Sequence, residues 1–167
     1  LQVYADFSGY TDIAIGIALL MGFYLPQNFD SPYKSQNPQE FWRRWHMSLS
    51  RWLKSYLYIP LGGSRCSKLR SYYNIFVTFL VSGIWHGANW TFILWGLLHG
   101  TLQVIEKILK LHKLTNRGFI KVLRILTTFL LINFAWILFR MSDIDSAIEV
   151  YRKILFQFDG EIYIADK

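Results

Sequence analysis

The sequence is poor in charge and has almost no cysteine. Only 17% of its 167 residues are Asp, Glu, Lys or Arg, whereas soluble domains carry about 25%. The single cysteine, Cys66, excludes an internal disulfide framework and a metal site made of several cysteines. The chain also lacks a G-x-S-x-G nucleophile elbow and a P-loop. These absences argue against a serine nucleophile and against substrate activation by ATP within this chain.

Apolar residues, in contrast, are abundant and lie in long runs. They make up 53% of the chain, including 7 tryptophans and 13 phenylalanines. Residues 1–25 and 120–139 are each long enough to cross a bilayer, for which about 20 residues suffice. We therefore expect an all-α, multi-pass protein of the cell membrane, in contact with lipid. Because Leu1 already lies within such a run, we also expect this chain to be a piece of a longer protein with helices before it.

The net charge of +7 is concentrated in two loops. Residues 34–70 hold eight basic residues and one acid, and residues 106–124 hold six basic residues and one acid. The segment after Phe139 has four basic and six acidic residues. This is the pattern of the positive-inside rule, and no nucleic-acid motif accompanies it, so we expect no nucleic-acid partner. Both basic loops are predicted to be cytoplasmic and the last segment to be outside.

Two segments have the pattern of amphipathic helices. For residues 37–59, Asn37 and Glu40 form a predicted capping box with a proline at the first helical position. One apolar face follows, and a basic face lies opposite, which is typical of a helix in the membrane interface. That apolar face comprises Phe41, Trp45, Leu49, Trp52 and Tyr56, and His46 lies on the same side. Residues 142–158, with a predicted capping box of Ser142 and Asp145, form a second such helix suited to packing or docking.

Residues 72–105 form a nearly continuous apolar segment between the two basic loops. If both loops are cytoplasmic, this segment must enter the membrane and return as a re-entrant or short helical hairpin. Its weak point is the stretch from Gly83 to Asn89, where glycine and asparagine disfavour helix. Non-helical backbone at that depth is tolerated only inside protein or against a wet cavity. The pattern therefore predicts a cavity that contains His86.

Ionisable side chains within a bilayer are costly, so His86 and His46 are the candidates for chemistry. A neutral imidazole could act as a general base toward a hydroxyl, or as part of a proton or ion relay. Metal binding is less consistent with the histidine spacing, and no metal site is expected. His99 is expected to form a hydrogen bond across helices, and His112 to be solvated. Asp6 and Asp12 support either polar packing or the same cavity.

Three stretches closely resemble the membrane-bound O-acyltransferase family. They are YADFSGYTDIAIGIALLMGF (4–23), NFDSPYKSQNPQEFWRRWHMSLSRWLKSYLYIPLGGSR (28–65) and VSGIWHGANWTFILWGLLHG (81–100). The resemblance is greatest to the bacterial alginate O-acetylation branch, with the D-alanyl transfer branch of teichoic acid modification next. It implies a multi-helix bundle around a tunnel, with the WHG histidine, His86, as the essential catalytic residue. The RWH histidine, His46, would line the same tunnel.

The resemblance also implies the reaction and its partners. An acetyl or acyl group would pass from a cytoplasmic thioester, acetyl-CoA or an acyl-carrier thioester, to hydroxyls of an exported alginate-like polysaccharide. His86 would be the general base, His46 would orient donor or acceptor, and Trp45, Trp85 and Asn89 would shape the site. No permanently bound cofactor is expected. A periplasmic or extracellular acetylation partner and a cytoplasmic acidic carrier, bound by the basic face of residues 37–59, complete the scheme.

Three alternatives remain open at this stage. D-alanyl transfer to teichoic acid would use the same mechanism. A transporter or proton relay would place ionisable residues along several spans and show duplicated halves, and the sequence has no internal repeat. A scaffold for polysaccharide export would need neither His86 nor His46.

Overall fold

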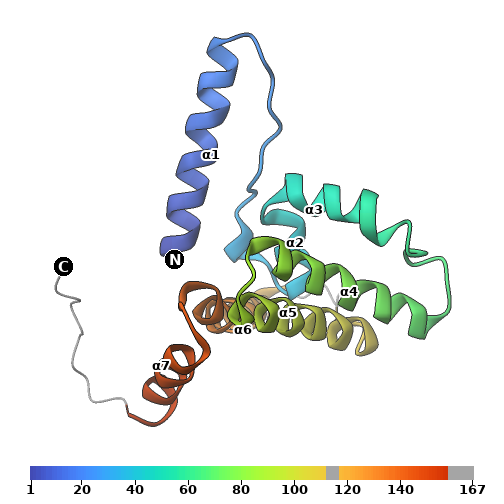
Figure 1. Ribbon diagram of the computed structural model, residues 1–167, viewed down its shortest axis with the longest axis vertical. Coiled ribbons are helices and arrows are strands. Elements are labelled where there is room, and N and C mark those ends of the chain that lie inside the picture. Colours follow the sequence, from blue (N-terminus) through green and yellow to red (C-terminus); the bar gives the residue numbers. More distant parts are fainter. Residues whose placement is uncertain (112–116, 158–167) are drawn as a thin grey trace.

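The computed structural model describes residues 1–111 and 117–157, and within them every regular element is helical. Figure 1 shows α1 standing apart from the other helices, most of which gather near and below its N-terminal end, with α3 beside its lower half. The helices are α1 (Gln2–Leu20), α2 (Pro38–Arg44), α3 (Met47–Leu53), α4 (Lys68–His86), α5 (Trp90–Ile108), α6 (Gly118–Arg140) and α7 (Ile144–Phe156), with a 3₁₀ turn η1 (Pro32–Lys34) and a π-helical turn η2 (Lys54–Tyr58).

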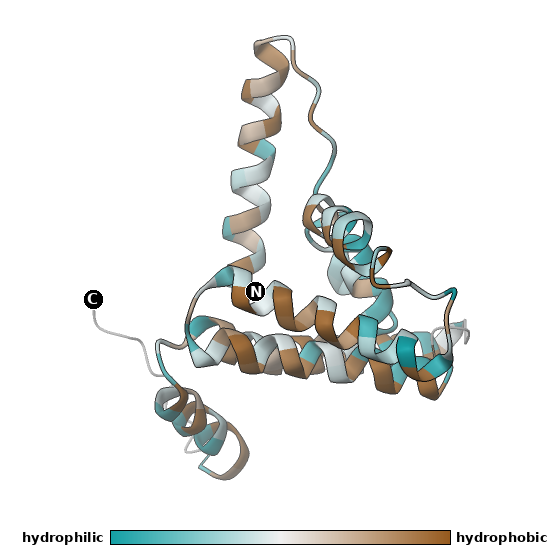
Figure 2. Ribbon diagram, turned by 45° about the vertical axis from the view of Figure 1, so that its right-hand side comes forward, coloured by the Kyte–Doolittle hydropathy of each residue, from teal (hydrophilic) through white to brown (hydrophobic). Residues whose placement is uncertain are grey.

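Helices α1 and α6 are long and apolar enough to cross a membrane. The 23 residues of α6 span about 35 Å at 1.5 Å per residue, which exceeds the roughly 30 Å hydrocarbon core. Hydrophobic positions recur along both helices (Figure 2), and many of these side chains are exposed, with Leu20 of α1 at 90%. Exposed apolar side chains on helices of this length are suited to a lipid environment.

The expected single helix over residues 37–59 is wrong, because the chain breaks at His46. Asn37 does cap α2, its side-chain oxygen accepting from the Glu40 N–H at 2.7 Å. His46 then adopts a left-handed conformation, with φ of 44°, and a new helix, α3, begins at Met47. The residue before the break, Trp45, is extended rather than helical. The helical spacing of apolar residues in the sequence continues through this break. It therefore gives no sign that α2 and α3 are two separate helices.

Helices α4 and α5 form the expected hairpin, but it is longer than the predicted residues 72–105. Ser67 caps α4 through the Arg70 N–H, and α5 continues to Ile108, so each arm has 19 residues. The turn follows His86, and Gly83, which was expected in the turn, lies within α4. Figure 1 shows the two helices side by side.

Glycines bring the backbones of α4 and α5 into direct contact. A Cβ atom on Gly83 would clash with the Phe92 carbonyl oxygen, and one on Gly96 would lie 2.5 Å from the Phe79 carbonyl oxygen. Gly100 continues the seam one turn later, where a Cβ atom would lie 3.3 Å from Phe76. Small residues at such an interface allow the close approach by which membrane helices associate.

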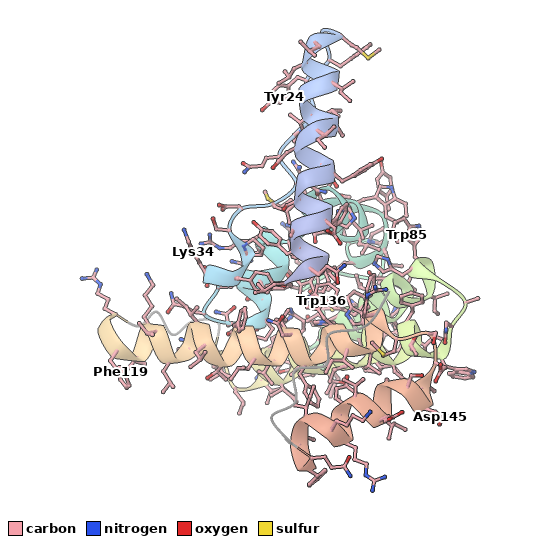
Figure 3. All side chains as sticks on the ribbon, turned by 90° about the vertical axis from the view of Figure 1, so that its left-hand side faces the viewer. Tyr24, Lys34, Trp85, Phe119, Trp136 and Asp145 are labelled. Carbon is pink, nitrogen blue, oxygen red and sulfur yellow. The ribbon has the colours of Figure 1, made fainter. Side chains whose placement is uncertain are left out.

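The core is aromatic and lies where α1, α2, α5 and α6 meet. Trp95 and Phe41 are 1% exposed and Trp45 is 3% exposed. In Figure 3, Trp136 of α6 lies among the side chains crowded beneath the N-terminal end of α1. Only the beginning of α1 reaches this core, through Val3, Tyr4 and Phe7. The core therefore joins α1, α2, α5 and α6, which are far apart in the sequence.

Helix α7 follows α6 after a short turn. Its cap is Asp143, whose carboxylate accepts from the Ser146 N–H at 2.8 Å, so the predicted cap at Ser142 is off by one residue. The Tyr151 hydroxyl donates to the Phe134 carbonyl at 3.0 Å and fastens α7 to α6. The predicted amphipathic segment extends to residue 158, which lies outside the described residues.

Candidate active site

His86 lies at the C-terminal end of α4, half-buried between aromatic rings from three helices. Its ring meets Phe139 of α6 edge-to-face, with centroids 5.0 Å apart, and Trp95 of α5 at 5.4 Å. Trp85 contributes a third contact at 5.1 Å. Among the described residues, neither ring nitrogen of His86 has a hydrogen-bond partner. Ring contacts alone thus position the imidazole, and both of its nitrogens remain available to a ligand.

His46 lies at the bend between α2 and α3 and is held by hydrogen bonds instead. Its Nδ1 lies 3.2 Å from the Asn28 side-chain oxygen and 3.3 Å from the Ser48 hydroxyl. The ring of Phe7, from α1, packs edge-on against it with centroids 4.8 Å apart. One nitrogen of His46 is therefore engaged, while the opposite one, Nε2, points away from Asn28.

The structure brings the two predicted histidines into one neighbourhood. Burial lowers the pKa of His46 to about 4, and the nearby His86 contributes further to that lowering. Two imidazoles that influence each other in this way cannot both be charged without cost, because like charges repel. His46 is consequently neutral at physiological pH, as a proton acceptor must be.

The other three predicted site residues have different positions. Trp45 is buried in the aromatic core, stacked on Phe41 with centroids 5.4 Å apart. Trp85 is 63% exposed, and Figure 3 shows it at the edge of the fold, away from Trp136. Asn89 caps α5 through the Thr91 N–H and donates its amide to the Ser142 carbonyl. Of the three, only Trp85 makes a ring contact with a candidate histidine, and the roles of all three stay predictions.

His99 was expected to bond across helices, and this is confirmed. The Trp42 indole N–H donates to Nδ1 of the fully buried His99 at 3.2 Å, which links α2 to α5. The ring of Trp95 packs against His99 at 4.8 Å and against His86 at 5.4 Å. Trp95 thus separates the buried histidine from the candidate catalytic one. Sequence reasoning missed Trp95, because a tryptophan in an apolar run has no distinguishing signal.

A groove of about 680 Å³ lies between the α2–α3 segment and the α4–α5 hairpin. Its walls include four cations and apolar side chains, with no acidic residue among them. The cations are Arg43, Arg51, Lys54 and Lys107. Neither His46 nor His86 lines the groove, although Met47, next to His46, and Ser82, one turn before His86, both do. The groove therefore runs close to the histidines and is suited to an anionic, partly apolar ligand.

Arg44, one of the basic residues in the segment 37–59, is engaged within the fold. Its guanidinium lies 2.9 Å from a Glu40 carboxylate oxygen and 3.5 Å from that of Asp30. Glu40 also accepts from the Gln36 N–H at 2.9 Å. Arg44 therefore clamps α2 to the preceding loop.

The fold and site define an all-helical membrane protein with two histidines in an aromatic setting. The sequence model of the membrane-bound O-acyltransferase family matches residues 1–144. The chain belongs to this family.

Named relatives are similar over most of this chain. It is 52% identical to a peptidoglycan O-acetyltransferase of Helicobacter pylori, over 90% of the chain and 29% of that protein. It is 47% identical to the "Probable alginate O-acetylase AlgI" of Pseudomonas aeruginosa, over 94% of the chain and 30% of that protein. A teichoic acid D-alanyltransferase of Bacillus subtilis is 34% identical, over 83% of the chain and 38% of that protein. The chain spans about a third of the length of these relatives.

Proposed function

We propose that this chain carries the catalytic histidines of an O-acetyltransferase that modifies hydroxyls of an exported polysaccharide. The observation that carries the proposal is the pairing of His86, with both ring nitrogens unengaged, and a neutral His46 in one aromatic neighbourhood. Membership of an O-acyltransferase family supplies the reaction class.

In the proposed reaction His86 is the general base. It takes the proton of the acceptor hydroxyl while the hydroxyl oxygen attacks the carbonyl carbon of the thioester. The carbon–sulfur bond breaks, the new ester forms, and His86 returns the proton to the leaving thiolate. A positioned base of this kind accelerates such a step by about 10²–10⁴-fold. The reaction consumes no further reagent, and no step requires a resident cofactor or metal.

The basic groove is the proposed approach for the donor. Acetyl-CoA and a carrier-bound thioester both carry phosphate, which suits Arg43, Arg51, Lys54 and Lys107. An acidic carrier protein would dock on the same cations, and this electrostatic match would mainly raise the association rate. Arg44, already paired with Glu40, is left out of this docking surface.

The proposed arrangement places the α4–α5 hairpin within the bilayer and both basic loops in the cytoplasm. His86 would then lie at the far end of α4, reachable by a polysaccharide from outside, with a tunnel joining it to the cytoplasmic donor. A periplasmic or extracellular protein that carries acetylation further is part of the same proposal. The membrane is taken to be the cell membrane, which the protein crosses several times.

The decisive experiment uses the complete protein in membrane vesicles, supplied with radiolabelled acetyl-CoA and an acceptor polysaccharide. His86→Ala should abolish transfer while membrane abundance stays normal. Trp90→Phe is a matched control, because Trp90 is 67% exposed and lies just after the same turn. Wild-type transfer by His86→Ala would refute the proposal.

Acetyl rather than D-alanyl transfer is favoured by the degree of similarity. Identity is 47–52% to the relatives named for O-acetylation and 34% to the D-alanyltransferase. Vesicles offered both donors, each with its own carrier, should therefore transfer acetyl. If only D-alanine is transferred, the substrate assignment changes and the role of His86 does not.

A further inference from the structure

One amide oxygen, that of Asn28, collects three contacts at the bend before α3. It lies 3.1 Å from the Ser48 backbone nitrogen, 2.9 Å from the Ser48 hydroxyl and 3.2 Å from His46 Nδ1. Asn28 is 8% exposed, and its own backbone carbonyl accepts from the Met47 N–H at 2.9 Å. Asn28 thus binds His46 at the bend and the two residues that follow it, although it lies 18 residues before His46.

These contacts determine where His46 carries its proton. A backbone N–H can only donate, so the Asn28 atom that Ser48 contacts must be the carbonyl oxygen and not the amide nitrogen. An oxygen acceptor requires a proton on the facing histidine nitrogen, Nδ1. In a neutral imidazole the other nitrogen then has no proton and offers a lone pair. The Ser48 hydroxyl donates to the same Asn28 oxygen, so the arrangement favours the Nδ1–H form of His46, with Nε2 as its acceptor.

We propose that Asn28 is a positioning residue of the reaction, which holds His46 in the Nδ1–H form so that Nε2 accepts a hydrogen bond from the acceptor hydroxyl. This inference rests on the proposed function. It gives the two histidines different roles: His86 moves the proton, and His46 orients the group that bears it.

The groups around His46 stabilise its neutral Nδ1–H form. Phe7 of α1 covers the ring, Asn28 and Ser48 occupy Nδ1, and His86 of α4 is the titratable neighbour that acts on it. Burial and His86 both lower the pKa of His46, to about 4, so the neutral imidazole persists through the physiological range. His46 has a left-handed backbone, φ 44°, at the bend where its ring meets Asn28.

The first test measures the tautomer directly, without relying on activity. The complete protein, labelled with ¹³C and ¹⁵N at histidine, is studied by NMR in detergent, and His46→Asn identifies the His46 signals. We expect shifts of the Nδ1–H form, and a midpoint that rises by at least about one pH unit in Asn28→Asp, because a carboxylate stabilises the imidazolium. Asn37→Asp is the matched control: Asn37 is equally buried and accepts a backbone N–H, yet it caps α2 and should leave the midpoint unchanged.

The second test measures transfer. Asn28→Leu removes the acceptor and should lower kcat by about 10-fold or more with little change in KM, as expected for loss of an oriented group. If Asn28→Leu does not accumulate in membranes, the titration midpoint of His46 in Asn28→Asp tests the inference instead. An Nε2–H tautomer, or an unchanged midpoint in Asn28→Asp, overturns the inference. These results are independent of whether His86→Ala abolishes transfer, so the two proposals can fail separately.

Discussion

The Trp42 indole N–H donates to Nδ1 of His99 across 3.2 Å, and this bond joins α2 to α5 beside the aromatic core. Trp95 packs against His99 on one side and His86 on the other. The buried pair therefore supports one wall of the candidate active site, although neither Trp42 nor His99 touches His86.

Trp42→Phe should destabilise the protein by about 1–2 kcal/mol, because His99 Nδ1 loses its donor while the ring volume is largely kept. The measurement is thermal or denaturant unfolding of the complete protein in detergent. Trp52→Phe serves as the control, since Trp52 is 54% exposed and should change stability by less than about 0.5 kcal/mol. Equal stability of the two variants would show that the Trp42–His99 bond contributes nothing.

Gly96→Ala should destabilise by roughly 1–3 kcal/mol, because the new methyl group would lie 2.5 Å from the Phe79 carbonyl oxygen and force α4 from α5. Gly16→Ala, in the middle of α1, meets no atom within 4 Å and should be neutral or stabilising by up to about 1 kcal/mol. Unfolding midpoints of the two variants give the comparison. A harmless Gly96→Ala would contradict the close approach of the two backbones.

Glu106→Leu should cost about 1–3 kcal/mol, since the buried carboxylate accepts from the Gln39 N–H at 2.7 Å in the first turn of α2. Removing it leaves that N–H without its acceptor. Glu149→Ala removes an exposed carboxylate that lies 2.8 Å from Lys153, and it should leave stability nearly unchanged because solvent screens an exposed ion pair. The ratio of the two losses, measured by chemical unfolding, tests whether Glu106 fastens α2 to α5.

Stability should fall as the pH is lowered from 6.5 toward 4. The pKa of His46 is about 4 in the folded protein, against an ordinary value of 6.5, because burial disfavours its charged form. Between these values the unfolded chain binds the extra proton, so the contribution of His46 is complete above pH 6.5 and is lost on acidification. His46→Asn, which tolerates the left-handed backbone, should show a shallower decline in melting temperature over this range. An unchanged slope would contradict the assignment.

Local signals in the sequence identified several elements correctly. Asn37, followed by proline and Glu40, predicted the start of α2, and the Asn37 oxygen does accept the Glu40 N–H. His86 and His46 were singled out because polarity is scarce in apolar segments, and the structure places them together. A helix cap involves residues a few positions apart, and a rare ionisable residue stands out in an apolar run. Both can therefore be recognised in the sequence without knowledge of the fold.

The features that sequence missed depend on distant partners. No glycine or proline marks the break at His46, and the apolar spacing continues through it; the bend is held by Asn28, 18 residues earlier. Phe139 completes the wall of His86 from a helix 53 residues later in the chain. Such long-range contacts produce no periodic pattern in the sequence, because they form only when α1, α4, α5 and α6 pack together.

The glycine seam between α4 and α5 restricts how any molecule can reach His86. With Gly83 and Gly96 in backbone contact, the two helices leave no passage between them along this seam. In the proposed reaction, donor and acceptor would therefore approach His86 from outside the α4–α5 seam.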